Sequence, residues 1–305
     1  MSAKPAGLLD IESLDRTEIE SILARTVFFQ PLPNETYRRL DTLRGKMIVN
    51  LFFENSTRTR VSFEIAARRL GAETVSIAAQ TSSTSKGESL VDTLNTLVAM
   101  RPDAIVMRHS ASGAPHFLSR HLQIPIINAG DGTHEHPTQA LLDARTILDR
   151  GKSLEGLRVA IIGDIAHSRV ARSNVYLLSK FGAEIVLCGP ASLLPRELAH
   201  IAPGVTLTND IREAIRDADV IMMLRVQLER QHEAAFPSAE YFQFYGLRLE
   251  HLALAKPDVI VMHPGPINRG RELSSEVADS QRSVILNQVE NGVAVRMAVL
   301  ERVIG

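Results

Sequence analysis

Residues 47–71 have the sequence MIVNLFFENSTRTRVSFEIAARRLG, and their order of apolar and polar residues predicts the architecture of the chain. The stretch opens with an apolar run over 47–53 that is nearly continuous, as is typical of a parallel strand covered on both faces. A helical pattern follows from Ser56 to Leu70 and ends at Gly71, a favourable residue just beyond a helix C-terminus. A buried strand that leads directly into a helix predicts a parallel α/β sheet.

The alternation of strand and helix continues along the chain in two series. Helical patterns separate the runs, one of them with Leu90, Leu94, Leu97 and Val98 on one face. The sequence therefore predicts an α/β fold with two domains, each a parallel sheet flanked by helices. Further apolar runs predict strands at 74–78, 104–108 and 124–128 in the first series, and at 158–162, 184–188, 220–224 and 259–263 in the second.

These two series predict two domains of similar size. We expect the first to span residues 1–136 and to be completed by an amphipathic helix over 287–305, and the second to span residues 137–286. A helix over about 137–150 would join them, because Pro137 suits the first turn of a helix.

Composition excludes several classes of function. The 305-residue chain has a formal net charge of −1, which favours neither nucleic acid nor an acidic membrane surface as a partner. The single cysteine, Cys188, excludes an internal disulfide, and its apolar neighbours predict a buried side chain rather than a nucleophile. The N-terminus lacks the pattern of a signal peptide and no apolar stretch is long enough to span a bilayer, so the expected location is cytoplasmic.

The junction between the first strand and its helix is the strongest candidate for a binding site. Backbone N–H groups in the first turn of a helix have no intrahelical partner, and the helix dipole favours an anion there. Ser56, Thr57 and Thr59 add hydroxyl donors, and Arg58 adds a guanidinium that can bind two phosphate oxygens. Ser56 could instead merely cap the helix, but two hydroxyls and an arginine directly after a buried strand favour a phosphate site.

This stretch resembles the carbamoyl-phosphate signature of the aspartate and ornithine carbamoyltransferase family, which is unbroken at residues 56–60 (STRTR). Residues 106–109 (VMRH) resemble the family strand whose arginine reaches the substrate carbonyl, and residues 136–139 (HPTQ) match a second family motif. Such matches run from about Phe52 to Asn291. The resemblance implies transfer of a carbamoyl group from carbamoyl phosphate to an amine, with no cofactor.

The resemblance also implies roles for individual residues. Acyl transfer needs donors aimed at the developing oxyanion, and Thr59, Arg108 and His136 match the family residues in that role. Gln139 matches the residue that binds the carbamoyl amide, for which a glutamine offers both a donor and an acceptor. With Arg58, these residues would bind and activate carbamoyl phosphate. No protein nucleophile or base is evident, so the leaving phosphate is a plausible acceptor of the amine proton.

A loop rich in serine and threonine, residues 81–88, matches one that family members send into the active site of a neighbouring subunit. The resemblance implies that Ser82 and Lys86 contact the phosphate across a subunit boundary, and that the chain forms a homotrimer with shared active sites. The sequence leaves open whether regulatory chains or a dihydroorotase also bind.

A metal site is not expected from the sequence. His134 and His136 could be a pair of metal ligands, but no third ligand is evident and Pro137 follows at once to start a helix. We therefore predict a catalytic site without a metal.

The second domain carries the residues expected to select the acceptor. Arg169, Arg225 and Gln227 follow predicted strands, where ligands bind in such sheets, and they match positions that bind aspartate in the family. Residues 263–266 (HPGP) resemble the aspartate-type motif HPLP rather than the ornithine-type HCLP. Gly265 departs from that motif, so only the backbone contribution of Pro264, Gly265 and Pro266 is carried over. The resemblance thus implies L-aspartate as the acceptor, N-carbamoyl-L-aspartate as the product, and a role in de novo pyrimidine biosynthesis.

Three other functions fit the sequence less well. A carbamoyltransferase for ornithine or an acylated derivative is disfavoured by Arg225, by Gln227 and by the absence of the ornithine-type cysteine from residues 263–266. A nucleotide-binding dehydrogenase is suggested by residues 161–164 (IIGD), but the glycine-rich fingerprint is absent. A non-catalytic homologue retained as a scaffold is disfavoured because every motif residue is present.

Overall fold

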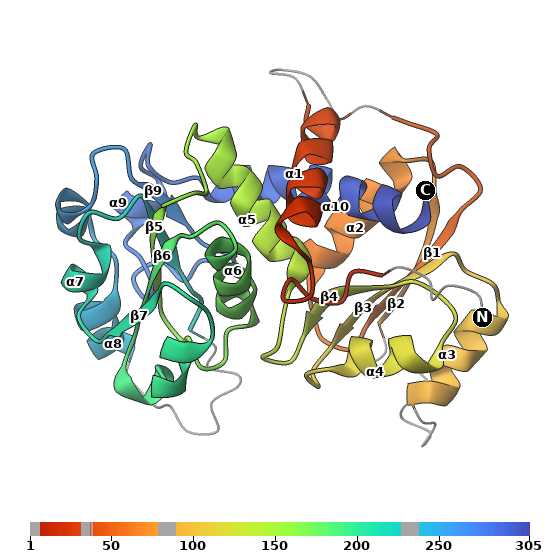
Figure 1. The fold of residues 1–305 in the computed structure, drawn as a ribbon, viewed down its shortest axis with the longest axis horizontal. Coiled ribbons are helices and arrows are strands. Elements are labelled where there is room, and N and C mark those ends of the chain that lie inside the picture. Colours follow the sequence, from red (N-terminus) through yellow and green to blue (C-terminus); the bar gives the residue numbers. More distant parts are fainter. Residues whose placement is uncertain (1–6, 32–36, 38, 79–89, 227–237) are drawn as a thin grey trace. The chain divides into compact units, whose positions relative to one another are not determined.

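The structure, a computed structural model, describes residues 7–31, 37, 39–78, 90–226 and 238–305. The chain divides into two compact units (Figure 1). Unit 1 comprises Met1–Leu141 with Asn291–Gly305, and unit 2 comprises Leu142–Glu290. Two helices, α5 (Pro137–Asp149) and α10 (Ile285–Ile304), carry the chain from one unit to the other.

Unit 1 contains a four-stranded parallel sheet in the order β2-β1-β3-β4. Helices α3 and α4 lie on one face of the sheet, and α1, α2 and the end of α10 lie on the other (Figure 1). The elements before α5 are α1 (Arg16–Phe29), β1 (Met47–Phe52), α2 (Thr57–Arg69), β2 (Glu73–Ala78), α3 (Leu90–Ala99), β3 (Ala104–His109), α4 (Ala114–His121) and β4 (Ile126–Asp131).

The sheet of unit 1 is buried on both faces, which explains its nearly unbroken apolar runs. Residues 48–52 are all buried, and alternate residues such as Val49 and Leu51 pack with Leu94 of α3 and Leu118 of α4. On the opposite face α2 packs against β1 and β2. α2 ends before Gly71, whose φ of +83° lies in the left-handed region that favours glycine.

Unit 2 contains a five-stranded parallel sheet in the order β7-β6-β5-β8-β9. Its main core, which includes Ile162, Cys188, Met223 and Tyr241, is fully buried. Besides parts of α5 and α10, its elements are β5 (Arg158–Ile162), α6 (Arg169–Ser179), β6 (Glu184–Cys188), β7 (Val205–Thr208), α7 (Ile211–Ile215), β8 (Val220–Met223), α8 (Ser238–Tyr245), β9 (Ile260–Met262) and α9 (Ser275–Ala278), with 3₁₀ turns at Ala191–Leu193, Arg196–His200 and Leu249–Leu254.

The predicted fold class is confirmed: each unit is a parallel sheet flanked by helices. Two strands of the sheets differ from the prediction in extent or were not predicted. The strand expected at 124–128 begins at Ile126 and continues to Asp131. The polar residues Asn128 and Asp131 fit inside it because they form hydrogen bonds within the protein instead of facing solvent. Strand β7 was missed, because its four residues lie at the sheet edge and only Val205 is buried. The substrate assigned to each predicted domain stays a prediction.

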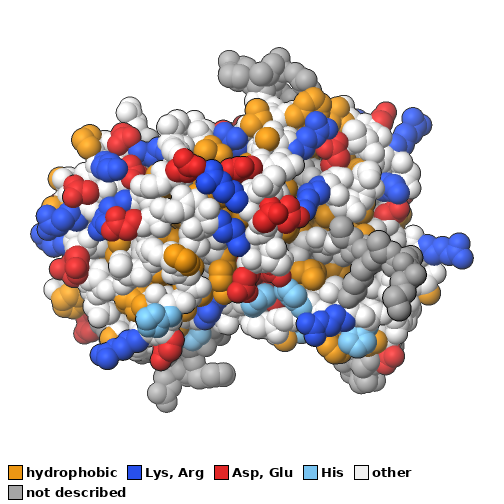
Figure 2. Space-filling model, viewed as in Figure 1, with side chains coloured by type: hydrophobic (Ala, Val, Ile, Leu, Met, Phe, Trp, Pro, Cys, Tyr) orange, Lys and Arg blue, Asp and Glu red, His pale blue; other side chains and the backbone are white. Residues whose placement is uncertain are grey.

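The distribution of charged side chains on the surface agrees with the small net charge of the chain. On the face drawn in Figure 2, basic and acidic side chains are interspersed, and neither sign forms a broad patch. Among the residues that the structure describes, no helix combines the length and apolar character needed to cross a membrane.

Candidate functional site

In unit 1, the ends of three neighbouring strands bring the predicted phosphate-binding residues to one edge of the sheet. β1 leads into α2, β3 ends at Arg108 and His109, and β4 leads into the segment before α5. Phe52 pairs with Arg108, and His109 pairs with Asp131, so these parallel strands end side by side. Such an edge is where parallel α/β sheets bind ligands.

The first turn of α2 is open rather than capped. Ser56 occupies the N-cap position but makes no side-chain capping hydrogen bond, and the first turn holds no acidic residue. Thr57 and Arg58 are exposed, whereas Thr59 is buried. The turn therefore combines backbone N–H groups, hydroxyls and a guanidinium at one helix terminus, which suits a phosphate.

Arg108 is held beside this turn by a partner that the sequence analysis missed. Its Nε donates to Oε2 of Glu54 at 3.2 Å, and one terminal nitrogen donates to the carbonyl of Ala129 at 3.3 Å. Both side chains of the ion pair are largely buried. Glu54 lies two residues before Ser56, inside the quoted motif stretch, so its acidic charge next to two arginines was the signal available in the sequence.

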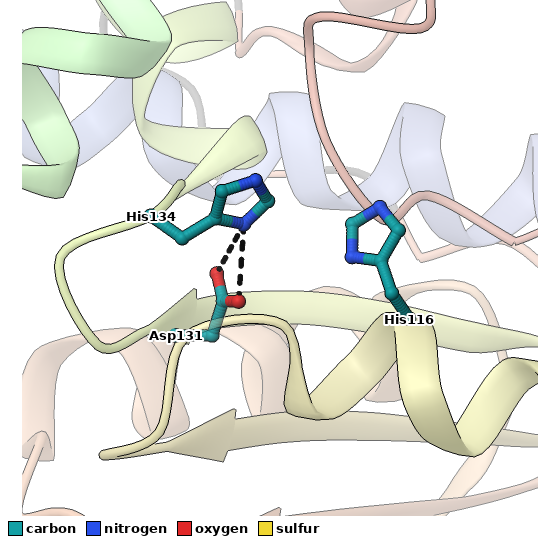
Figure 3. Close-up of side chains that lie close together, drawn as sticks. All are labelled: His116, Asp131 and His134. Carbon is teal, nitrogen blue, oxygen red and sulfur yellow. Dashed lines mark hydrogen bonds and ion pairs between the residues drawn. The ribbon is translucent and has the colours of Figure 1, made fainter.

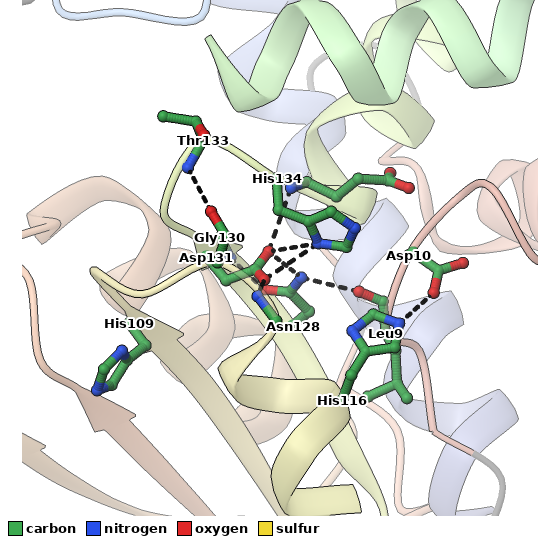
Figure 4. Close-up of polar contacts among 12 residues, drawn as sticks. Leu9, Asp10, His109, His116, Asn128, Gly130, Asp131, Thr133 and His134 are labelled. Carbon is green, nitrogen blue, oxygen red and sulfur yellow. Dashed lines mark hydrogen bonds and ion pairs between the residues drawn. The ribbon is translucent and has the colours of Figure 1, made fainter. Parts of the chain in front are cut away.

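A network centred on Asp131 shapes the segment that carries His136 (Figure 4). Asp131 is fully buried, and its carboxylate accepts from Asn128 Nδ2 at 2.8 Å and from the backbone N–H groups of Gly113 and Glu135 at 2.6 and 3.2 Å. Its backbone N–H donates to the carbonyl of Glu135 at 3.1 Å. Burial alone would raise the pKa of Asp131, but the bonds from His134, Asn128 and Gly113 outweigh burial and lower it.

His136 and Gln139 are presented by the start of α5. Pro137 is the first residue of this helix, as predicted, and the carbonyl of His136 accepts from the Gln139 N–H at 2.9 Å. His136 is 4% exposed and Gln139 8%. Both belong to unit 1, together with the α2 turn and Arg108, so the described residues that are predicted to bind carbamoyl phosphate share one unit.

In unit 2, Arg169 begins α6 shortly after the end of β5. Ser168 is the N-cap, and its hydroxyl accepts from the Ala171 N–H at 3.1 Å. Arg169 is only 4% exposed. The turn before it is fixed by the fully buried Asp164, whose Oδ1 accepts from the backbone N–H of His167 at 3.2 Å and lies 2.8 Å from its Nδ1.

Arg225 follows β8, which neighbours β5 in the sheet, and a buried carboxylate holds the segment after it. Glu272 is fully buried, and its Oε1 accepts from the Val226 N–H at 3.1 Å and from Asn268 Nδ2 at 2.8 Å. Its Oε2 accepts from the Asn268 N–H at 2.9 Å. Burial raises the pKa of Glu272 despite these bonds. Glu272 was also missed by the sequence analysis.

Residues 263–266 follow β9, the third of the neighbouring strands β5, β8 and β9. The buried ring of His263 accepts at Nδ1 from the Gly265 N–H at 2.8 Å. Gly265 has a φ of +67° and is followed by a cis peptide to Pro266. The departure from the family motif at Gly265 thus has a physical reason, because this left-handed conformation favours glycine.

The strand ends therefore gather the predicted residues into two groups, one in each unit. Ser56, Thr57, Arg58, Thr59, Arg108, His136 and Gln139 lie at the edge in unit 1, and Arg169, Arg225, Pro264, Gly265 and Pro266 lie at the edge in unit 2. Ser82, Lys86 and Gln227 lie outside the described residues.

Known proteins resemble the chain over nearly its whole length. Residues 7–149 match the carbamoyl-P binding domain of aspartate/ornithine carbamoyltransferases, and residues 155–303 match the Asp/Orn binding domain of the same proteins. The aspartate carbamoyltransferase catalytic subunit of Solibacter usitatus is 81% identical over 301 residues, which cover 99% of this chain and 100% of that protein.

Solved structures of both kinds of enzyme share the fold. Aspartate transcarbamoylase from Trypanosoma cruzi, in complex with carbamoyl aspartate and phosphate, is 33% identical with a TM-score of 0.87, covering 100% of this chain and 97% of that one. Ornithine carbamoyltransferase from Pyrococcus furiosus is 30% identical with a TM-score of 0.87, covering 100% and 99%. The fold alone does not separate the two acceptors.

Proposed function

Because the chain belongs to the aspartate/ornithine carbamoyltransferase family, we propose that it transfers the carbamoyl group of carbamoyl phosphate to the α-amino group of L-aspartate. The products are N-carbamoyl-L-aspartate and phosphate. One observation carries the proposal: the first turn of α2 is uncapped, free of acidic residues and flanked by Arg108 at the end of β3. An anion with an adjacent carbonyl is the ligand that such an edge suits.

The residues of unit 1 supply binding and electrostatic stabilisation. The N–H groups of the α2 turn, the hydroxyls of Ser56 and Thr57 and the guanidinium of Arg58 bind the phosphate group. Thr59, Arg108 and His136 donate to the carbonyl oxygen, whose negative charge grows as the amine attacks. Gln139 fixes the orientation of the carbamoyl amide. The C–N bond forms and the bond to the phosphate oxygen breaks, and the departing phosphate accepts the amine proton.

The residues of unit 2 select the acceptor. Arg169 and Arg225 supply the cations that the two carboxylates of aspartate require, and a cationic acceptor such as ornithine would be repelled. The 81% identical relative is named for aspartate, which agrees with this charge. The segment Pro264–Pro266 contributes through its backbone, and Gln227 through its side chain.

The activity has a direct test. The purified chain should form N-carbamoyl-L-aspartate and phosphate from carbamoyl phosphate and L-aspartate, with each product measured separately. L-ornithine at equal concentration should give no detectable citrulline. Comparable turnover with ornithine would overturn the choice of acceptor, and no turnover with either amine would favour the non-catalytic alternative.

The proposal extends to the oligomeric state of the chain, its location in the cell and its metabolic pathway. We place the chain in the cytoplasm, in pyrimidine biosynthesis, as a homotrimer whose loop 81–88 supplies Ser82 and Lys86 to the site of a neighbouring subunit. Mixing inactive Lys86→Ala and Arg58→Ala trimers, after dissociation, should restore activity, because roughly a quarter of the sites in a random mixture combine two intact contributions. If mixed trimers form and stay inactive, Lys86 acts within its own subunit.

A further inference from the structure

Three side chains from separate parts of unit 1 converge beside the segment that carries His136. They are His116 of α4, Asp131 at the end of β4, and His134 in the turn that follows, and Figure 3 shows the three facing one another. Each residue offers one ligand atom, and these three atoms all lie within 4.8 Å of one another. The two imidazole rings meet edge to face, with 5.3 Å between their centroids.

Each imidazole has one ring nitrogen close to a carboxylate, but only the carboxylate beside His116 lies outside the cluster. His116 Nε2 lies 2.5 Å from Oδ2 of Asp10, and His134 Nδ1 lies 3.1 Å from Oδ2 of Asp131 (Figure 4). Asp10 accepts from His116 Nε2 and leaves a lone pair on Nδ1, which is the arrangement that outer carboxylates give to metal-binding histidines. Asp131 belongs to the cluster itself, and the 3.1 Å between its Oδ2 and His134 Nδ1 is close to the spacing of two ligand atoms on one ion.

The second nitrogen of His116 lies on the side of the other two residues. Its Nδ1 is buried and has no hydrogen-bond partner among the residues that the structure describes, and Figure 3 shows it on the side of the ring toward Asp131 and His134. A buried imidazole nitrogen without a partner is unfavourable unless something fills that position. A metal cation that shares this lone pair would satisfy the nitrogen.

The charge around the cluster also favours a cation. The carboxylates of Asp131, Glu135 and Asp10 all act on His134. The side chains of His116 and His134 are about 30% exposed, at 29% and 31%, so an ion can reach them from solvent. A carboxylate and two imidazoles are a donor set typical of zinc and similar transition metals rather than of calcium or magnesium.

We propose that His116, Asp131 and His134 bind a divalent transition-metal ion of the zinc class, with Asp10 as the outer carboxylate that orients His116. Three protein ligands leave a fourth position for water. Ligand atoms around a tetrahedral zinc lie roughly 3.3 Å apart, so the present atoms must approach one another by up to about 1.5 Å. Rotation of the two part-exposed histidines supplies that movement.

The proposed site differs from the one that the sequence made conceivable. The sequence alone suggested His134 and His136 as two metal ligands and offered no third one. In the folded chain, His134 instead lies beside His116 and Asp131. The ion would join α4 to the turn at residues 131–134, two residues before His136. It would therefore act as a structural clamp on that segment, separate from the carbamoyl-phosphate groups.

Binding of the metal itself is the direct test. The full-length chain, prepared without a histidine tag and stripped with a chelator, is titrated with Zn²⁺ by calorimetry and with Co²⁺ by visible absorption. We expect one ion per chain and a Co²⁺ spectrum typical of tetrahedral coordination. His116→Ala and His134→Ala should each weaken binding at least a hundredfold, and Asp10→Asn roughly 10- to 100-fold, as loss of an outer carboxylate does elsewhere.

His121→Ala is the matched control, because His121 lies on the same helix, is exposed, and its Nδ1 contacts only the Phe117 carbonyl among the described residues. It should bind Zn²⁺ like the unaltered chain. Circular dichroism of every variant confirms that it is folded, and Asp131 is left unchanged because it holds several backbone groups. Failure of the unaltered chain to bind, or equal binding by both histidine variants and the control, would overturn the proposal.

Discussion

Helices α2 and α6 begin in comparable ways and differ in how their first turns are satisfied. Each follows a strand of a parallel sheet, has a serine at the N-cap, and has no acidic residue in its first turn. Ser168 caps α6 with its hydroxyl at 3.1 Å from the Ala171 nitrogen, whereas Ser56 makes no such bond in α2. One turn is completed by its own side chain, and the other is open to a ligand.

The difference supports the proposed division of the two substrates between the units. In the proposed site, the backbone at the open turn of α2 is itself a binding group, and exposed Arg58 adds to it. At the closed turn of α6 the Ser168 side chain already accepts from the backbone, so we propose that recognition there depends on the arginine side chains that buried carboxylates position nearby. We therefore expect phosphate binding to depend on the helix terminus, and aspartate binding to depend on individual cations.

The largest expected effect is at the open turn. Arg58→Ala should lower turnover at least a hundredfold, about 3 kcal/mol of transition-state stabilisation, because a two-point phosphate contact is lost. The measurement is steady-state kinetics with saturating aspartate. Arg68→Ala, at the exposed far end of the same helix, is the control and should retain normal turnover. A near-normal rate for Arg58→Ala would mean that Arg58 is only a surface charge.

A smaller and more selective effect is expected at the second unit. Arg225→Ala should weaken use of aspartate by about 2 kcal/mol, roughly thirtyfold in KM, because a carboxylate loses its cation. Calorimetry of carbamoyl phosphate with this variant should give an affinity close to that of the unaltered chain. Loss of affinity for both substrates together would contradict the division between the units.

The protonation of Glu272 gives a further test of the comparison between the units, through the pH dependence of aspartate affinity. Burial raises its pKa, so the carboxyl protonates above the usual value of 4.5 and then loses an acceptor for Val226 or Asn268. Affinity for aspartate should fall as pH drops toward 4.5, while Glu272→Gln should raise KM about tenfold and remove that pH dependence.

The stability of the fold should respond to Glu272 with the opposite sign. A folded-state pKa above the unfolded value means that the folded chain binds the proton more readily, so the contribution is present at low pH and is lost as pH rises through the folded pKa. Urea unfolding between pH 4 and 7 measures this. Parallel changes in stability and aspartate affinity would show that Glu272 does not hold the Arg225 segment.

The smallest expected effect is on the free energy of unfolding, in a direct comparison of Ser168 with Ser56. Ser168→Ala should lower the free energy of unfolding by about 1 kcal/mol, because it removes a cap. Ser56→Ala should change stability by no more than a few tenths of a kcal/mol, and should instead weaken carbamoyl-phosphate binding. Equal loss of stability in both variants would mean that the two turns are alike.

Features that depend on residues adjacent in the sequence could be predicted. Features that depend on contacts between distant residues could not. The turn at residues 53–60 was predictable because an apolar run, hydroxyls and an arginine adjoin one another in sequence. The network of Asp131 was not, because it depends on Asn128 bonding to the carbonyl of Leu9, 119 residues away. Pairing of His116 with Asp10 spans 106 residues and has no local pattern at all.

The two helices that pass between the units have a consequence for synthesis of the chain on the ribosome. Residues 291–305, which belong to unit 1, are made only after all 149 residues of Leu142–Glu290. At typical rates of translation, unit 1 waits roughly 7–30 s for its last helix. During that interval the surface later covered by Ala294, Met297 and Leu300 is exposed, so the nascent chain presents an apolar face that a chaperone would recognise.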